Sequence, residues 1–277
     1  MKIINAIPEL RAELENRKNI AFVPTMGNLH EGHLALVEKA KRHADCVVVS
    51  IFVNPLQFSP NEDFDQYPRT LIADCELLKN LNVDIVFTPE NKILFPVEQE
   101  ILVLLPPIAD QYEGAYRPGF FRGVATIVLK LFNIVQPNIA IFGKKDYQQL
   151  HIVRLLVQQF NLPIDILDVE TVRTSDGLAL SSRNQYLNAS QQIEANQLFQ
   201  TLSTIKSDLN AGQTNYSRLE KNAFDSLRMK GWSVDYVAIL NQASLTQAKT
   251  EDKELVVVAA ARIGHTRLID NIEVNQK

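Results

Sequence analysis

Residues 20–42 read IAFVPTMGNLHEGHLALVEKAKR, and this stretch decides the fold. It opens on a short apolar run at residues 20–23, which predicts a buried strand. It closes at residues 31–42 on a pattern in which apolar residues recur on one face of a helix. A glycine-containing turn joins the two. Such a strand–turn–helix unit is typical of a parallel α/β sheet, in which ligands bind at the carboxyl ends of the strands.

The same alternation of strands and helices continues along the first part of the chain. Further strands are predicted at residues 46–53, 83–87, 139–142 and 164–169, and helices at residues 67–81, 121–135 and 147–160. Pro68 is expected in the first turn of its helix, where a missing N–H group costs nothing. The predicted fold class is α/β, with a parallel sheet covered by helices on both faces.

Beyond residue 185 the pattern changes to two helices followed by three strands. The helices are expected at residues 190–210 and 216–230, and Asn188 with Gln191 forms a capping pair for the first of them. The strands are expected at residues 233–240, 254–261 and 266–269, with a tight hairpin between the last two. We therefore expect an α/β domain at residues 1–171 and a smaller α+β domain at residues 172–277.

The composition is that of a globular protein, because 46% of the residues are hydrophobic and 22% are charged. No run approaches the about 20 apolar residues that a membrane-spanning helix needs, and we see no secretory pattern. A net charge of −4 without a basic run argues against a nucleic-acid partner. Cys46 and Cys75 are expected to be buried free thiols, which agrees with a reducing cytoplasm.

The turn after the first strand carries the first candidate site. Gly27 and Gly32 allow close backbone approach, and the following helix N-terminus offers N–H donors to a phosphate. His30 and His33 are three residues apart and share a helical face, so each can donate to phosphate oxygens. The alternatives are a pair of histidines that cap the helix and a metal pair, although helical zinc histidines usually lie four apart with a third ligand. A dinucleotide site would need G-x-G-x-x-G, which this turn lacks.

Neutral amides follow the second strand. Asn54 and Gln57 lie where that strand ends, and their amides can bind the hydroxyl, carboxylate or amine groups of a small polar substrate. The alternative is a plain turn, since Asn-Pro is a common turn dipeptide.

A pair of lysines follows the strand at residues 139–142. Gly143 turns the chain, and Lys144 or Lys145 can reach a phosphate where the next helix N-terminus adds a favourable partial charge. Asp146 has a plain alternative role as the helix cap.

A polar loop near the expected domain junction carries the last candidate site. Ser181, Ser182 and Arg183 present two hydroxyls and a guanidinium on consecutive residues, a combination suited to phosphate. The alternative is a solvated hinge.

Six segments, taken in order, resemble the pantothenate synthetase family. They are residues 24–33, 52–58, 63–70, 117–124, 143–149 and 181–184. The resemblance is strong over residues 20–190 and weak beyond them. The family belongs to the nucleotidyltransferase group of Rossmann-like folds, and its H-x-G-H turn is similar to that of class I aminoacyl-tRNA synthetases.

The resemblance implies an ATP-dependent ligase. ATP would activate pantoate as an acyl-adenylate, which β-alanine then attacks, with Mg²⁺ accompanying ATP and with a homodimeric enzyme. The domain expected at residues 1–171 would bind ATP and pantoate, and the domain expected at residues 172–277 would act as a lid.

The resemblance also implies roles for single residues. The catalytic residues would be His30, His33, Lys145 and Arg183, with His33 as the candidate proton donor. The substrate-binding residues would be Asn54, Gln57 and Gln149, and Asp74 is a candidate ligand of Mg²⁺. The nucleotide pocket would be lined by Met26, Gly27, Asn28, Leu29, His30, Glu31, Gly32, His33, Gly143, Lys144, Lys145, Asp146, Val172, Leu180, Ser181, Ser182 and Arg183.

One position departs from the family pattern, and two other functions compete. Leu180 stands where many family members carry methionine, and this swap of similar apolar side chains is expected to change little. A plain nucleotidyltransferase with a phosphorylated acceptor would share the histidine turn but not the two substrate glutamines. A nucleotide-binding sensor without catalysis would not need His30, His33, Lys145 and Arg183 together.

Overall fold

The computed structural model describes residues 1–59, 62 and 64–276. These residues form two compact units. The first unit consists of Met1–Gly143 and Ile152–Glu170, and the second of Lys144–His151 and the chain from Thr171 onward. The chain therefore passes between the units three times. A domain boundary at residues 171 and 172, and the lid role of the second domain, stay predictions.

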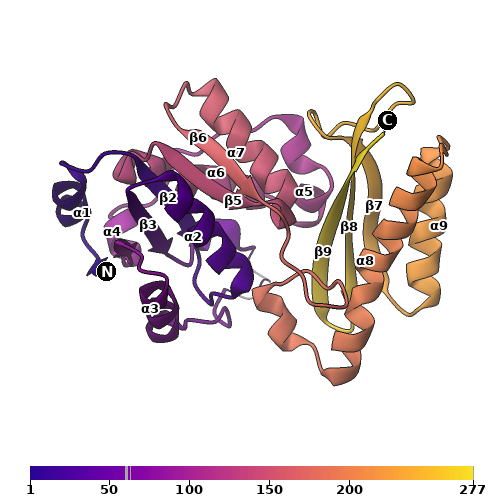
Figure 1. Cartoon of the computed structure of the whole chain (residues 1–277), viewed down its shortest axis with the longest axis horizontal. Helices are drawn as coiled ribbons and strands as arrows, with labels where there is room; N and C mark the ends of the chain where they lie inside the picture. The colour runs from indigo at the N-terminus through magenta and orange to yellow at the C-terminus, as the bar shows by residue number, and fades with distance from the viewer. Residues whose placement is uncertain (60–61, 63, 277) are drawn as a thin grey trace. The chain divides into compact units, whose positions relative to one another are not determined.

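The first unit is built on a parallel sheet, which confirms the predicted α/β class (Figure 1). Its described strands follow the order β1-β4-β3-β2-β5-β6, and every pairing is parallel. They are β1 (Lys2–Ile4), β2 (Ile20–Thr25), β3 (Cys46–Ile51), β4 (Ile85–Phe87), β5 (Ile139–Gly143) and β6 (Asp165–Val169). Because β3 and β5 flank β2, the crossovers change direction there, and open α/β sheets bind ligands at such a point.

Helices pack on this sheet and bury its apolar residues. From α2, Leu36, Val37 and Ala40 contact a cluster that includes Val47 and Val49 of β3. The helices of this unit are α1 (Ile7–Leu14), α2 (Glu31–His43), α3 (Leu71–Asn80), α4 (Asn91–Leu94), α5 (Glu113–Tyr116) and α6 (Phe120–Val135), with the larger part of α7 (Tyr147–Gln159). Short 3₁₀ helices η1 (Pro55–Gln57) and η2 (Pro107–Asp110) connect them. The apolar stripe read from the sequence of α2 thus faces the core.

The helix predicted at residues 67–81 begins at Leu71, so Pro68 lies before it and not in its first turn. Two effects explain the difference. A residue before proline is disfavoured in the helical conformation, which applies to Tyr67. The guanidinium of Arg69 also donates to the backbone carbonyls of Phe64, Asp65 and Tyr67 at 3.2–3.3 Å and holds that segment as a turn. Asp63, in the same motif, lies outside the described residues.

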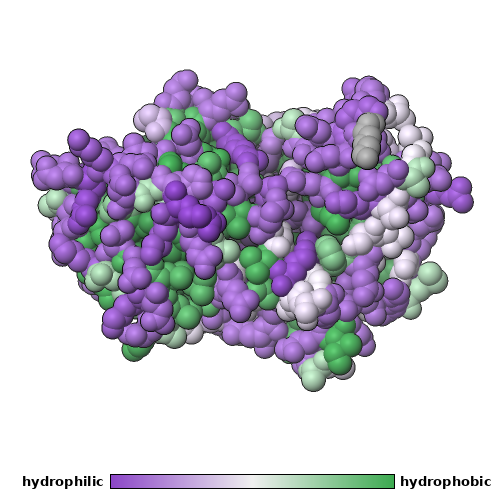
Figure 2. All heavy atoms as spheres, viewed as in Figure 1, coloured by the Kyte–Doolittle hydropathy of each residue, from purple (hydrophilic) through white to green (hydrophobic). Residues whose placement is uncertain are grey.

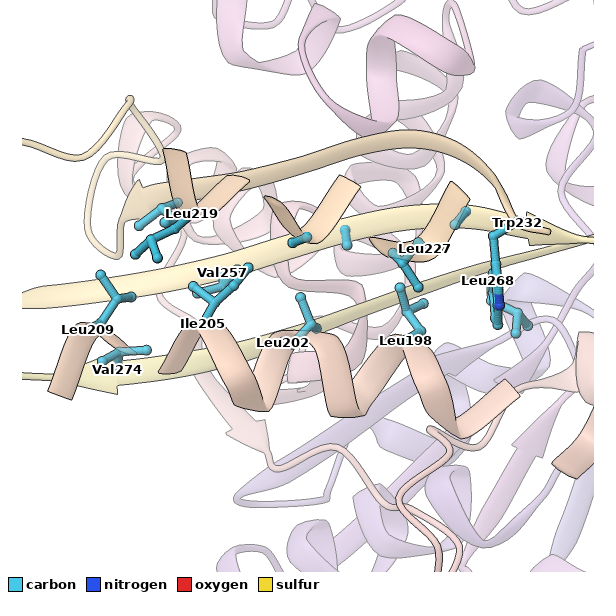
Figure 3. Packing of buried hydrophobic residues seen from close by; sticks show 14 of the residues in the cluster. Leu198, Leu202, Ile205, Leu209, Leu219, Leu227, Trp232, Val257, Leu268 and Val274 are labelled. Atoms are coloured by element: carbon cyan, nitrogen blue, oxygen red, sulfur yellow. The ribbon is translucent and has the colours of Figure 1, made fainter. Parts of the chain in front are cut away.

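The second unit contains helices α8 (Ala189–Asn210) and α9 (Tyr216–Met229) and an antiparallel sheet. The strands are β7 (Ser233–Asn241), β8 (Glu254–Ile263) and β9 (Thr266–Asn275), in that order. Figure 3 shows Leu198, Leu202, Ile205 and Leu209 of α8 pointing from one helical face toward β8 and β9. Their spacing is that of an amphipathic helix covering a sheet. This confirms the predicted α+β second part.

The capping pair predicted for α8 is confirmed. The N–H of Gln191 donates to Oδ1 of Asn188 at 2.9 Å, and the N–H of Asn188 donates to Oε1 of Gln191 at 3.0 Å. The two bonds satisfy donors that a helix N-terminus otherwise leaves without a partner.

The last strand is longer than predicted. Its expected end was residue 269, but β9 continues to Asn275 and stays paired with β8 throughout. Asp270 and Asn271 interrupt the apolar pattern there and look like a strand end in the sequence. Both are buried, because other parts of the second unit supply their hydrogen-bond partners.

Hydrophilic residues cover most of the surface drawn in Figure 2. Within the described residues, none of the helices combines the length and the apolar character that crossing a bilayer requires.

Candidate active site

The N-terminus of α2 is capped by two histidines. The N–H of Gly32 donates to Nδ1 of His30 at 3.1 Å, and the N–H of His30 donates to Nδ1 of His33 at 3.3 Å. The two rings lie with their centroids 4.2 Å apart. The capping alternative read from the sequence is therefore what the structure contains.

Capping does not compete with a role in phosphate binding. An imidazole whose Nδ1 accepts a hydrogen bond carries its proton on Nε2 when it is neutral. The cap thereby selects, for His30 and for His33, the tautomer whose Nε2–H is a donor. Both donors belong to the first turn of a helix, where the backbone dipole also favours an anion.

A buried carboxylate anchors the turn that precedes these histidines. Asp74, 1% exposed, accepts the N–H of Asn28 at 2.9 Å and that of Leu29 at 2.8 Å, one on each oxygen. Thr70 donates its hydroxyl to the same carboxylate at 3.1 Å. Gly27 has a φ of +83°, and a Cβ there would lie 3.0 Å from Oδ2 of Asp74. The structure thus gives Asp74 an anchoring role, and its assignment as a Mg²⁺ ligand stays a prediction that its burial disfavours.

The predicted substrate amides form a small buried network at the end of β3. Asn54 donates from Nδ2 to Oε1 of Gln57 at 3.0 Å and to the carbonyl oxygen of Gly123 at 3.3 Å. Oδ1 of Asn54 accepts the N–H of Leu56 at 3.2 Å and so caps η1. Nε2 of Gln57 contacts Sδ of Met26 at 3.0 Å. The first and second predicted motifs are therefore brought together.

Arg117 ties the same loop to α6. Its guanidinium donates to both carboxylate oxygens of Glu62 at 2.7 and 3.0 Å and to the carbonyl oxygen of Gln57 at 3.2 Å. It also lies over the ring of Phe120, 3.6 Å from the centroid. The sequence analysis matched the motif at residues 117–124 to the family but gave Arg117 no role. The structure shows that Arg117 fixes the loop that carries Gln57, through partners that are distant from it in sequence.

In the second unit, the lysines lie in the 3₁₀ turn η3 (Lys144–Asp146), hereafter the lysine turn. Nζ of Lys144 pairs with Oε2 of Glu273 at 2.8 Å, and the hydroxyl of Tyr147 donates to Oε1 of the same residue at 2.8 Å. Nζ of Lys145 lies 3.9 Å from a carboxylate oxygen of Asp146. The two adjacent lysines thus have different surroundings. Gln149 lies one turn further, in α7.

The second polar element of this unit is the serine–arginine loop, residues 171–184. Leu180 donates its N–H to the carbonyl of Val172 at 3.0 Å, so this part folds back on itself as a small hairpin. Ser181 caps the 3₁₀ helix η4 (Ser182–Tyr186) by accepting the N–H of Arg183 at 3.3 Å. The loop is therefore hydrogen-bonded along its length and is not a plain solvated hinge.

The predicted residues divide between the two units. Those before residue 144 belong to the first unit, and Lys144, Lys145, Asp146, Gln149, Val172, Leu180, Ser181, Ser182 and Arg183 belong to the second. Within the described residues no group of three or more His, Cys, Asp or Glu side chains could hold a metal ion.

Residues 2–273 match the model of the family described as pantoate-beta-alanine ligase. The chain is 58% identical over 277 residues to the pantothenate synthetase of Nitrosospira multiformis, and the match covers 100% of this chain and 99% of that protein. A crystal structure of pantothenate synthetase from Thermus thermophilus is similar with a TM-score of 0.94 at 42% identity, covering 99% of this chain and 100% of that one. A pantoate-beta-alanine ligase from Francisella tularensis, crystallised with β-γ ATP and β-alanine, has a TM-score of 0.82 at 35% identity, with 98% and 97% covered.

Proposed function

Because the chain belongs to the pantoate-β-alanine ligase family, we propose that it uses ATP to join pantoate to β-alanine through a pantoyl-adenylate. The Francisella relative, crystallised with β-γ ATP and β-alanine, supports these two substrates. The observation that carries the residue assignment is the double histidine cap of α2, which selects Nε2–H donors at a helix N-terminus beside the substrate amides.

In the first step, a carboxylate oxygen of pantoate attacks the α-phosphorus of ATP. The bond from that phosphorus to its bridging oxygen breaks, and pyrophosphate leaves with the electron pair. Such a reaction needs positioning and stabilisation of phosphate charge more than it needs a covalent nucleophile. His30 and His33 donate hydrogen bonds to the phosphates, and Lys145 and Arg183 balance the charge that moves to the leaving pyrophosphate.

In the second step, the amine of β-alanine attacks the activated carbonyl carbon. The amide bond forms, the amine loses a proton, and AMP leaves with the electron pair of the broken bond between the carbonyl carbon and the phosphate oxygen. Gln57 and Gln149 hold the hydroxyl and carboxylate groups of pantoate, and Asn54 fixes the direction of the Gln57 amide through the bond to its Oε1. Met26, which precedes the histidine turn in the chain, contacts Gln57 through its Sδ.

The proposal extends to Mg²⁺, a homodimer and the cytoplasm. A nucleoside triphosphate ordinarily binds with Mg²⁺, so removal of the ion by a chelator should stop pyrophosphate release.

Cys46 and Cys75 are both buried and free, which suits a reducing compartment such as the cytoplasm. Burial raises the pKa of the Cys46 thiol to about 11, so it stays protonated. Sedimentation at several concentrations would test the homodimer.

The decisive experiment replaces His33 by asparagine and by alanine. In His33→Asn the amide oxygen can take the place of Nδ1 as the cap acceptor, but the amide nitrogen is too close to the backbone to replace the Nε2 donor. In His33→Ala both are lost. We expect His33→Asn to unfold at nearly the wild-type denaturant concentration and yet to form adenylate about 10²-fold more slowly, the usual effect of removing one transition-state donor.

Single-turnover release of pyrophosphate from ATP and pantoate measures that step. Wild-type release should require pantoate, and AMP release should require β-alanine in addition. Near-normal pyrophosphate release by folded His33→Asn would show that His33 only caps α2, and its assignment as a phosphate donor would have to be abandoned.

A further inference from the structure

Two polar residues in β9 make contacts that the proposed reaction leaves unexplained. Asp270 and Asn271 are only 5% and 6% exposed, although both side chains are polar. Each is hydrogen-bonded to a different polar segment of the second unit. These segments are the lysine turn, which carries Lys145, and the serine–arginine loop, which carries Arg183.

Asn271 binds the lysine turn through its side-chain amide. Nδ2 donates to the carbonyl oxygen of Lys144 at 2.8 Å and to that of Lys145 at 2.9 Å. A carboxamide nitrogen has two hydrogens, so it can satisfy two consecutive carbonyls at once. These two carbonyls belong to the peptide groups on either side of the Cα of Lys145. Holding both of them fixes the backbone position from which the Lys145 side chain extends.

Glu273, two residues further along β9, holds the neighbouring lysine. Its carboxylate pairs with Nζ of Lys144 at 2.8 Å and accepts the hydroxyl of Tyr147 at 2.8 Å. Because the Lys144 ammonium group is paired with a carboxylate of β9, Lys145 is the lysine better suited to bind phosphate. One strand thus orders the turn at both its backbone and its side chains.

Asp270 holds the serine–arginine loop through Arg173. The guanidinium of Arg173 donates to both oxygens of Asp270 at 2.7 Å and to the carbonyl oxygen of Asn271 at 3.1 Å. Oδ1 of Asp270 also accepts the N–H of Asn271 at 2.8 Å, which links the two anchors directly. Arg173 bridges to Ala179 across the small hairpin that leads to Arg183.

We propose that Asn271 is a positioning residue of the ligase reaction, which aims Lys145 at the ATP phosphates from the strand that also anchors the loop of Arg183. The inference rests on the proposed function, because it concerns a cation of the adenylation step. A small displacement of a positioned group is costly, since about 1 Å can change a rate by about 10²-fold. Loss of the Asn271 amide should therefore slow adenylation even when the unit stays folded.

The test is a double-mutant cycle of Asn271→Ala and Lys145→Ala, followed by single-turnover pyrophosphate release. Asn275→Ala is the matched control, because it removes the same side chain from the same strand at an exposed position away from the lysine turn. Fluorescence of the single tryptophan, Trp232, which lies in the core of this unit, reports folding. Aminolysis of preformed adenylate is measured in parallel.

We expect Asn271→Ala to slow adenylation about tenfold or more and Asn275→Ala to leave it unchanged. In the Lys145→Ala background, Asn271→Ala should cost little further rate, because the group it positions is already gone. If Asn271 had a purely structural role, Asn271→Ala would instead lower the unfolding midpoint. The rate loss of the double variant would then equal the product of the two single losses.

Three outcomes would overturn the inference. If folded Asn271→Ala is fully active while Lys145→Ala is slow, the inference about Asn271 is wrong and the proposed function stands. The same holds if the two rate losses multiply fully in the double variant. Wild-type adenylation by Lys145→Ala overturns both the inference and the proposed role of that lysine. If Asn271→Ala does not fold, Asn271→Leu takes its place in the cycle, because it keeps nearly the size of the side chain and removes both donors to the carbonyls of Lys144 and Lys145.

Discussion

At the scale of single residues, Gln57 illustrates how a neutral amide can select a substrate. Its Oε1 accepts from Asn54, its backbone carbonyl accepts from Arg117, and its Nε2 lies against Met26. Gln57 as a residue is 9% exposed, so little freedom remains to reorient its side chain. A preset amide of this kind can discriminate among small polar acids, because a mismatched group would leave it without a partner.

We predict that Gln57→Glu raises the KM for pantoate more than tenfold and changes the affinity for ATP little. The substitution keeps the size of the side chain but places a carboxylate where the pantoate carboxylate is proposed to bind, and like charges at short distance repel. Calorimetry with each ligand separates the two effects. An equal loss of ATP affinity would show that Gln57 also contacts the nucleotide and would contradict its role as a selector of pantoate.

Residue roles were only partly predictable from the sequence. His30, His33, Asn54 and Gln57 could be singled out because polar groups after a strand mark a ligand site in α/β sheets. The network that orients them could not, since Asp74 binds backbone groups of Asn28 and Leu29 far from it in sequence. The strand expected at residues 266–269 stopped short of Asn271 for the same reason, because the carbonyls that Asn271 binds are those of Lys144 and Lys145.

At the scale of elements, the contact between α6 and η1 positions Asn54 and Gln57, the proposed substrate amides. Gly123 lets the helix approach so closely that a Cβ there would lie 2.0 Å from the carbonyl oxygen of Leu56. The carbonyl of Gly123 also accepts the hydrogen bond from Asn54. Backbone atoms cannot yield as a flexible side chain can, so an added methyl group must displace η1 or α6.

We predict that Gly123→Ala destabilises the protein by about 1–3 kcal/mol, the usual cost of overpacking, and raises the KM for pantoate. The shift of η1 carries Gln57 with it, whereas Lys145 and Arg183 belong to the other unit. Denaturant unfolding and steady-state kinetics measure the two effects. Asn133→Ala, at an exposed position of the same helix, should change neither. Unchanged pantoate kinetics in folded Gly123→Ala would contradict the role of this contact.

Elements were predicted well where one periodicity dominates and poorly where a tertiary contact overrides it. The α2 helix and the β2 and β3 strands follow their apolar patterns closely. The start of α3 differs because Arg69 holds the preceding turn, and the end of β9 differs because Arg173 and the lysine turn satisfy Asp270 and Asn271. Both errors occur where hydrogen bonds outside the local periodicity decide the boundary.

At the scale of the whole molecule, the proposed catalytic groups come from two units that each have their own core. The histidines belong to the first unit, and Lys145 and Arg183 belong to the second. The core of the second unit joins α8, α9 and its sheet, so this unit can present its cations from an ordered framework. The division matters for the reaction because adenylation and aminolysis make different demands on those cations.

We predict that changes at Arg183 impair adenylate formation more than aminolysis. A guanidinium can form paired hydrogen bonds with phosphate oxygens, which an ammonium group cannot. Arg183→Lys should therefore keep the charge but lose part of the rate of pyrophosphate release, and Arg183→Ala should lose more. Attack of β-alanine on preformed adenylate should suffer less, because the pyrophosphate that Arg183 stabilises has already left.

Single-turnover measurement of the two half-reactions distinguishes this role from a general one. Gln185→Ala, at an exposed position of the same 3₁₀ helix that has no predicted role in the site, shows how much a local change in η4 costs by itself. If both half-reactions slow equally in Arg183→Ala, the residue acts on something common to both steps, such as AMP or the fold of the loop. If adenylation does not slow at all, Arg183 has no part in the reaction, and the cation that balances the leaving pyrophosphate must be sought in Lys145 alone.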